Sequence, residues 1–375
     1  MASHGTGAAE REEQVMVSFG VEEEFMFLHP ETLRPVDVGP AVLRRFAADP
    51  VFAGVTNHEY LASQIEHTSA VYSTLDEASA ALLQFRRAVA AEAAEHGAIA
   101  ASVGMPFQAP LHPTITEDDR YERVIGAYRH IISDHQINGL HVHVEVPDPD
   151  AGVRALNHLR LWMPLLQAMS GNSPYWRGID TGYEGWRNIE LRRWAVSGCP
   201  PAFVDGADYH RRLQNVVGLG GTFDVGMVSW NVRLSNHVPT LEVRVFDAQL
   251  RADDTLLLAA VVRGLVTTAL SGATAADVPP ELLDDALWQA ARDGLLGPVL
   301  DPLSGSLADA GTAFRLLLDH IGARLDAEGD RAYVADGLER LLRDGTGARR
   351  QRAARAAGGP AALAIMLRES VAAAG

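Results

Sequence analysis

The chain has 375 residues, of which 47% are hydrophobic and 21% charged, a composition typical of globular proteins with one large or two ordinary domains. Its formal net charge of −16 argues against binding of nucleic acid or of an anionic membrane surface. All 32 basic residues are arginines. The absence of lysine excludes Schiff-base chemistry and a phosphate-binding loop that ends in Gly-Lys.

The N-terminal segment, the lack of long apolar runs and the single cysteine exclude further classes of protein. Residues 1–14 are polar and rich in Ala and Gly, without the apolar centre of a signal peptide, so we expect a disordered N-terminus. The sequence has no run of 18 apolar residues, which a membrane span would need. We therefore expect a cytoplasmic protein. Cys199 excludes an internal disulfide and a thiolate metal cluster, and we interpret it as a loop thiol.

Apolar periodicity and capping signals predict alternating strands and helices up to about residue 250. In chain order we expect a strand over 15–28, a short helix within 33–48, an extended segment over 57–69, a helix over 74–95 and a strand over 99–105. These are followed by a helix after Thr116, a strand over 140–146, a helix over 150–169 kinked at Pro164, a loop-rich segment over 172–194, a short helix from Tyr209, and strands over 227–234 and 240–248.

From Asp253 onward the pattern is helical almost to the end. Strands first and helices later predict an α+β fold with an antiparallel sheet and a helical C-terminal half. We expect a single domain over 15–375, sheet-rich over 15–250 and helical over 251–375.

The first strand contains three successive carboxylates, in Val21-Glu22-Glu23-Glu24-Phe25. Side chains alternate along a strand, so Glu22 and Glu24 share one face, while Glu23 shares the other with Val21 and Phe25. Two carboxylates on one face repel each other and are costly to bury. We therefore expect a divalent cation at Glu22 and Glu24, and a structural salt bridge or hydrogen bond at Glu23.

Four other predicted segments also carry polar or ionisable residues on one face. They are Gln64, Glu66 and Thr68; His141, His143 and Glu145; Asn231 and Arg233; Glu242 and Arg244. One such strand could be the solvated face of an antiparallel sheet. Five of them, mixing Glu, His and Arg, favour a functional cleft lined by the sheet.

The residue types in this cleft restrict its chemistry. Glu and His without Cys, with carboxylates in excess, favour Mg²⁺ or Mn²⁺ over Zn²⁺. Carboxylates that hold metal, combined with arginines, are suited to bind a polyphosphate. Such a site can promote phosphoryl transfer by positioning and charge neutralisation.

Seven short motifs in order point to a family. They are Gly20-Val21-Glu22-Glu23-Glu24-Phe25, Gln64-Ile65-Glu66, Gly139-Leu140-His141-Val142-His143-Val144, Asn172-Ser173-Pro174-Tyr175-Trp176, Asp180-Thr181-Gly182, Pro239-Thr240-Leu241-Glu242-Val243-Arg244 and Gly345-Thr346-Gly347-Ala348-Arg349-Arg350-Gln351. Together they resemble the ATP-dependent carboxylate–amine ligases of the glutamate–cysteine ligase type 2 family, over nearly the whole chain.

The resemblance implies a glutamine-synthetase-like fold, in which a curved antiparallel sheet flanked by helices forms the wall of the active site. It also implies ATP, Mg²⁺ (with Mn²⁺ as an alternative), small-molecule substrates and a homodimer. A substrate carboxylate would take the γ-phosphate of ATP, and an amine would then displace phosphate to give an amide.

By similarity, each predicted site residue has an expected role. The metal ligands would be Glu22, Glu24, Glu66, His141 and Glu242, with Glu59 as a weaker candidate. His143 would lie nearer the nucleotide phosphates; Arg233 and Arg244 would act in catalysis by neutralising phosphate or the substrate carboxylate; Arg187 would anchor a substrate carboxylate.

Two segments depart from the family pattern. Ser229-Trp230-Asn231-Val232-Arg233 has an amide at Asn231 where the family pattern has an aspartate, and Tyr183-Glu184-Gly185-Trp186-Arg187 replaces a smaller segment that contains serine. Both changes fall where substrates would be held. We therefore keep two alternatives to a glutamate–amine ligase: a metal-dependent hydrolase, and a catalytically reduced relative that binds nucleotide.

Overall fold

The computed structural model describes residues 17–273 and 278–373, so the predicted disordered segment 1–14 lies outside the described residues. Its centre is a seven-stranded antiparallel sheet with the order β10-β11-β5-β1-β3-β2, in which β4 also pairs with β1. The strands are β1 (Phe19–Leu28), β2 (Thr56–His58), β3 (Gln64–Thr68), β4 (Ile99–Ala101), β5 (Gly139–Glu145), β10 (Val232–Leu234) and β11 (Thr240–Asp247). The five segments with polar faces therefore contribute to one sheet, as expected.

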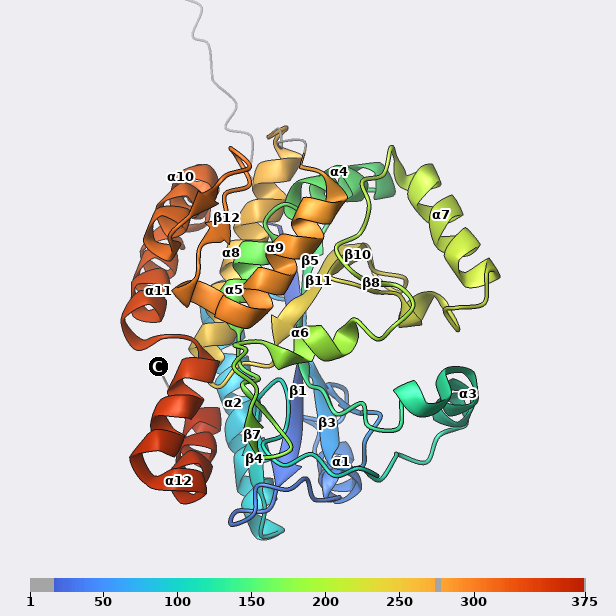
Figure 1. Cartoon of the computed structure of the whole chain (residues 1–375), viewed down its shortest axis with the longest axis vertical. Coiled ribbons are helices and arrows are strands. Elements are labelled where there is room, and N and C mark those ends of the chain that lie inside the picture. The colour runs from blue at the N-terminus through green and yellow to red at the C-terminus, as the bar shows by residue number, and fades with distance from the viewer. Residues whose placement is uncertain (1–16, 274–277, 374–375) are drawn as a thin grey trace, which may run out of the picture.

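Side chains of β1 alternate between the two faces of the sheet, as the sequence predicts. Val21, Glu23 and Phe25 of β1 are buried. Most of this face packs against helices, which include α2 (Leu75–Glu95), α4 (Pro149–Leu159) and α8 (Ala252–Leu270). Nearly every side chain of α8 is buried, because α8 lies between the sheet and the outer helices α10 (Ala310–Glu328) and α11 (Arg331–Asp344) (Figure 1). The opposite face carries the site at Glu22 and Glu24, while Met26 and Leu28 near the end of β1 are buried in a separate apolar cluster.

The remaining helices surround this core. They are α1 (Gly39–Ala47), α3 (Asp119–Tyr128), α5 (Met163–Ser170), α6 (Trp186–Leu191), α7 (Gly206–Gly218), α9 (Pro280–Asp293), α12 (Gly347–Ala372) and the 3-10 turns Arg129–Ile131, Val225–Met227 and Gly294–Leu296. Six short strands form separate pairs: β6 (Tyr175–Trp176) with β7 (Ile179–Asp180), β8 (Ser197–Gly198) with β9 (Ser229–Trp230), and β12 (Val299–Leu300) with β13 (Leu307–Ala308). Among the described residues the chain after 251 is mostly helical, as predicted.

Three predicted elements differ from the structure. The strand expected over 227–234 is divided into β9 and β10, which belong to different sheets. The helix expected over 150–169 is two helices, α4 and α5, and Pro164 lies in the first turn of α5. Proline is tolerated there because the first amides of a helix have no partner within it, so this proline begins a helix instead of kinking one. The segment over 57–69 is not continuously extended, since a turn separates β2 from β3.

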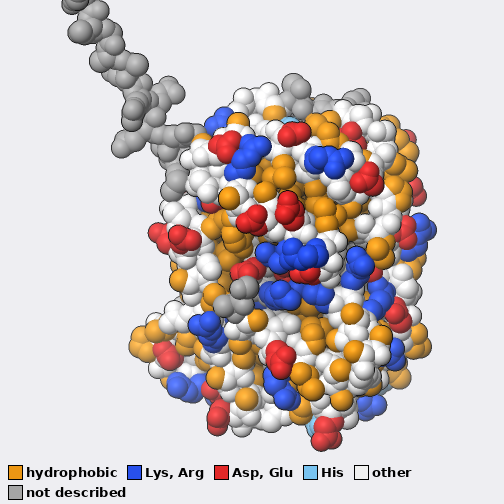
Figure 2. Space-filling view, turned by 90° about the vertical axis from the view of Figure 1, so that its left-hand side faces the viewer, with side chains coloured by type: hydrophobic (Ala, Val, Ile, Leu, Met, Phe, Trp, Pro, Cys, Tyr) orange, Lys and Arg blue, Asp and Glu red, His pale blue; other side chains and the backbone are white. Residues whose placement is uncertain are grey.

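The arginine run of α12 fastens this helix to the rest of the chain. Arg350 pairs with Asp254 of α8 at 2.6 Å, and Arg352 pairs with Asp180 and Glu184. Figure 2 shows arginine side chains gathered across the middle of the face that bears α10, α11 and α12. Arg350 and Arg352 therefore anchor α12 through ion pairs and are not freely solvated.

None of the described helices is long and apolar enough to cross a membrane.

Candidate active site

Glu22 and His141 lie opposite each other on β1 and β5, and the register of these two strands brings their side chains together. An oxygen of Glu22 lies 2.7 Å from Nδ1 of His141, and its other oxygen lies 3.4 Å from Nε2 of His143. Burial by itself would raise the pKa of Glu22, but the hydrogen bonds to the two histidines hold this pKa well below its usual value. The carboxylate is thus ionised and able to bind a cation.

Glu242 completes this first cluster from β11. It is buried and pairs with Arg233 of β10 at 2.8 Å and with Arg244 of its own strand. The two guanidinium groups outweigh the effect of burial and lower the pKa of Glu242. Glu22, His141 and Glu242 can each offer one ligand atom within 4.8 Å of the others.

A second cluster consists of Glu24, Glu59 and Glu66, whose oxygens also come within 4.8 Å of one another. Glu24 faces Glu66 in the register of β1 with β3, and Glu59 approaches from the turn between β2 and β3. Burial, reinforced by the neighbouring carboxylates, raises the pKa of Glu24 and of Glu66 to about 7 and that of Glu59 well above its usual value.

The two clusters fit divalent cations by their donor chemistry. Carboxylate oxygens with one imidazole nitrogen are the ligands that Mg²⁺ and Mn²⁺ accept. Three carboxylates packed together without a paired cation carry an electrostatic cost that a bound divalent ion removes. Glu24, Glu59 and Glu66 would hold one ion, and Glu22, His141 and Glu242 another.

Arg187 of α6 lies beneath these clusters and is buried. Its Nε and Nη1 have no hydrogen-bond partner, and burial lowers the pKa of its guanidinium. Gly139 makes room for it, because a Cβ at that glycine would lie 2.5 Å from Nη2 of Arg187. A buried guanidinium with unused donors is suited to receive a carboxylate.

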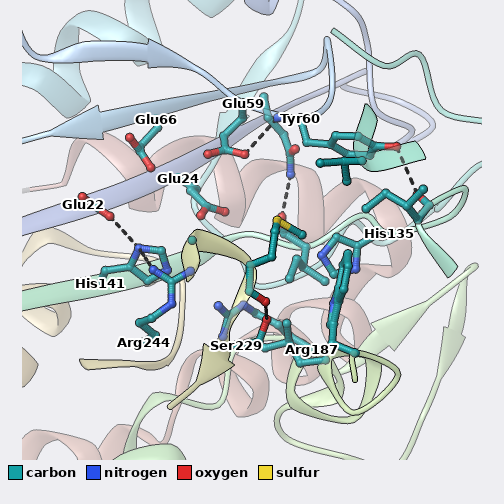
Figure 3. Close-up of a pocket in the computed structure, with 18 of the residues that line it drawn as sticks. Glu22, Glu24, Glu59, Tyr60, Glu66, His135, His141, Arg187, Ser229 and Arg244 are labelled. Carbon is teal, nitrogen blue, oxygen red and sulfur yellow. Dashed lines mark hydrogen bonds and ion pairs between the residues drawn. The ribbon is translucent and has the colours of Figure 1, made fainter. Parts of the chain in front are cut away.

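Two cavities meet at Glu22 and Arg244, which line both. The first, of about 300 Å³, contains Glu24, Glu59, Glu66, His141, Arg187 and Asn231. Figure 3 shows the carboxylates and His141 gathered at one end of this cavity, with Tyr60 and His135 toward the other. The second cavity, of about 550 Å³, is lined by His143, Arg233 and apolar groups that include Phe19, Val71 and Val238.

Glu23 lies on the other face of β1, away from Glu22 and Glu24, as strand alternation predicts. Glu23 is 1% exposed and forms a two-pronged ion pair with the buried Arg86 of α2, with a further hydrogen bond from Thr255 at 2.6 Å. Burial alone would raise its pKa, but the Arg86 guanidinium lowers it. This carboxylate is structural and does not line either cavity.

A family comparison identifies the chain. The family model described as glutamate–cysteine ligase family 2 matches residues 18–371. The chain belongs to this family. Two proteins of Saccharopolyspora erythraea, named "Putative glutamate--cysteine ligase 2-2" and "Putative glutamate--cysteine ligase 2-1", are similar to it. They are 37% and 40% identical over 98% and 90% of this chain and over 96% and 89% of their own lengths.

Solved structures share the fold of this family member. Glutamate–cysteine ligase from Francisella tularensis in complex with AMP superimposes with a TM-score of 0.71 at 14% identity, covering 94% of this chain and 87% of that one. A bifunctional glutathione synthetase from Pasteurella multocida gives 0.67 at 16% identity over 95% of this chain, which spans about half, 52%, of that longer protein. The fold is thus glutamine-synthetase-like, as the sequence motifs imply.

The structure brings every predicted site residue to the two cavities. They are Glu22, Glu24, Glu66, His141, His143, Arg187, Asn231, Arg233, Glu242 and Arg244. Glu59, only a weak candidate in the sequence, offers an oxygen within 4.8 Å of oxygens of both Glu24 and Glu66. Its signal was weak because it lies in a turn, where strand alternation does not predict the direction of a side chain.

Proposed function

We propose that this member of the glutamate–cysteine ligase family is an ATP-dependent ligase that joins the γ-carboxyl group of glutamate to an amine. The observation that carries the proposal is the meeting of two cavities at Glu22 and Arg244, with the cluster of Glu22, His141 and Glu242 at that junction and the second carboxylate cluster beside it in the first cavity. Such a junction allows a nucleotide from one cavity to present its terminal phosphate to a carboxylate held in the other.

The second cavity suits the nucleotide. Val71 and Val238 offer exposed apolar surface for a base, while His143 and Arg233 lie toward the junction as partners for phosphates. Arg244, which lines both cavities, would neutralise charge on the transferred phosphoryl group. Mg²⁺ or Mn²⁺ held by the two carboxylate clusters would screen the phosphate oxygens.

The first cavity suits the acid. The free donors of Arg187 would receive the α-carboxylate of glutamate and so direct its γ-carboxylate toward the junction. An oxygen of the γ-carboxylate would attack the γ-phosphorus of ATP, and ADP would leave. The amine nitrogen would then attack the acyl carbon, phosphate would leave with the electron pair of the broken C–O bond, and the nitrogen would lose its proton.

The test is ADP release from Mg-ATP with glutamate and a panel of amines, with mass spectrometry of the amide. Release that depends on both glutamate and amine supports the ligase. Metal-dependent hydrolysis without ATP would favour a hydrolase, and nucleotide binding without turnover would favour a catalytically reduced relative. The homodimer, the cytoplasmic location and the single domain over 15–375 remain predictions, which sedimentation, fractionation and limited proteolysis can test.

A further inference from the structure

The end of the first cavity that lies away from the metal clusters is lined mainly by apolar and aromatic side chains. They are Tyr60, Tyr121, Val124, Ile132, Leu191, Trp194 and Met227, which we call the aromatic wall. All seven belong to one hydrophobic cluster, separate from the main core. They come from α3, α6, the segments that follow these two helices, and the turns before β3 and β9. This wall plays no part in binding ATP or in transferring its phosphate in the proposed function.

The rings of the aromatic wall hold fixed positions. Tyr60 and Tyr121 meet edge to face at 5.2 Å, and Trp194 meets His135 edge to face at 4.8 Å. Nδ1 of His135 and Nε1 of Trp194 are buried without a hydrogen-bond partner. Burial lowers the pKa of His135 to about 3, so this ring is neutral at pH 7. The wall therefore offers apolar faces with a few neutral polar atoms.

The charge at this end of the cavity argues against an anionic ligand. Of the described residues that line the first cavity, only Arg120, Arg187 and Arg244 are arginines. Arg187 is taken up by the acid in the proposed function and Arg244 lies at the metal-cluster end. Arg120 is already paired with Asp224, at 2.5 Å through Nη1 and 3.4 Å through Nη2. A carboxylate placed against the aromatic wall would lose its hydration without gaining a free cation.

The order of events in the proposed reaction decides which substrate meets this wall. The nucleotide occupies the second cavity, beyond Glu22 and Arg244, and the acid is held by Arg187. The amine must then enter through the remaining part of the first cavity, so its substituent comes to lie against the aromatic wall.

We infer that the amine substrate is a primary amine with an aromatic or bulky apolar substituent and no carboxylate. This inference rests on the proposed function, because it assigns the wall to the amine half of that reaction. Burying such a substituent would favour it over a small polar one by at least about tenfold in kcat/KM. A free α-carboxylate on the same amine would instead lower kcat/KM.

The decisive measurement uses pairs of amines that differ only by a carboxylate. ADP release with Mg-ATP and glutamate is followed for cysteamine against cysteine and for 2-phenylethylamine against phenylalanine, with hydroxylamine as a small reference nucleophile. We expect each decarboxylated amine to exceed its amino acid by at least about tenfold in kcat/KM, and 2-phenylethylamine to be the best of the four.

Substitutions test whether the aromatic wall is the part of the cavity that selects the amine. Tyr121→Ala should lower kcat/KM for 2-phenylethylamine at least about tenfold more than for hydroxylamine, and Tyr121→Phe should restore it, since the ring supplies the contact. Leu342→Ala, at a surface leucine of α11 that is 44% exposed, is the control. Arg120→Gln should leave the ratio of cysteamine to cysteine within twofold.

The outcomes separate the two proposals. Hydroxylamine-dependent ADP release combined with a preference for cysteine over cysteamine overturns the inference but leaves the ligase intact, and loss of that preference in Arg120→Gln would assign the carboxylate to Arg120. A protein that releases no ADP with glutamate and any nucleophile, hydroxylamine included, overturns both.

Discussion

Glu22 is the side chain that touches both cavities and both histidines of β5. Replacing it by glutamine keeps its size but removes the charge that would hold a cation. Changes in groups that merely support metal ligands cost about 10–100-fold in activity, so we expect Glu22→Gln to lower turnover by at least about 100-fold.

The measurement is ADP release, with circular dichroism melting to show that the fold is kept. Glu95→Gln, at an exposed position near the end of α2, is the matched control and should keep full activity. Near-normal turnover by Glu22→Gln would mean that the metal site has been placed wrongly.

Glu23, its neighbour in sequence, should affect stability instead of chemistry. Glu23→Gln leaves the guanidinium of Arg86 buried with a neutral partner, which costs about 3–5 kcal/mol in the free energy of unfolding. Urea denaturation measures this change. The double variant Glu23→Leu/Arg86→Met removes both charges and should recover much of the loss, because an apolar pair needs no solvation. If the double variant is no more stable than Glu23→Gln, the buried pair is not the cause.

At the scale of elements, a close backbone contact holds α1 against the turn that leads into β3. A Cβ at Gly39 would lie 2.7 Å from the carbonyl oxygens of Ala62 and Gln64, so the backbone must shift to accept one. We expect Gly39→Ala to lower the free energy of unfolding by about 1–3 kcal/mol. Gly54, with nothing within 4 Å of its Cβ position, is the control, and Gly54→Ala should change stability by less than about 0.5 kcal/mol. Equal effects of the two substitutions would contradict this account.

The alternation of side chains along single strands predicted most of the site residues. It separates Glu22 and Glu24 from Glu23, because the period of two is a local property of the chain. The pairing of strands is not local, so the sequence could not predict that Glu22 faces His141 or that Glu24 faces Glu66. The mixture of Glu, His and Arg on five such faces indicated one cleft, and the resemblance of the motifs to a known family supplied the fold. Neither strand alternation nor motif resemblance predicts the aromatic wall, because its residues come from turns and short helices distant in sequence.

For the molecule as a whole, the cluster of Glu24, Glu59 and Glu66 makes the stability of the fold depend on pH and on bound metal. The pKa of Glu66 is about 7 in the folded chain and near 4.5 when unfolded, so the native state binds more protons between these pH values. Stability of the metal-free protein should therefore fall as pH rises from about 5 to 8, by on the order of 1–3 kcal/mol relative to Glu66→Gln, whose amide does not titrate.

Divalent metal should reverse this loss. At pH 8, Mg²⁺ or Mn²⁺ at 100 times its dissociation constant should stabilise the wild-type protein by about 2.7 kcal/mol. The same metal concentration should stabilise it less at pH 5, because protons compete with the metal for the same carboxylates. Glu66→Gln should gain less. Thermal melts with EDTA and with added metal across this pH range provide the measurement. A metal-free protein whose stability rises with pH relative to Glu66→Gln would show that Glu24, Glu59 and Glu66 do not share one site.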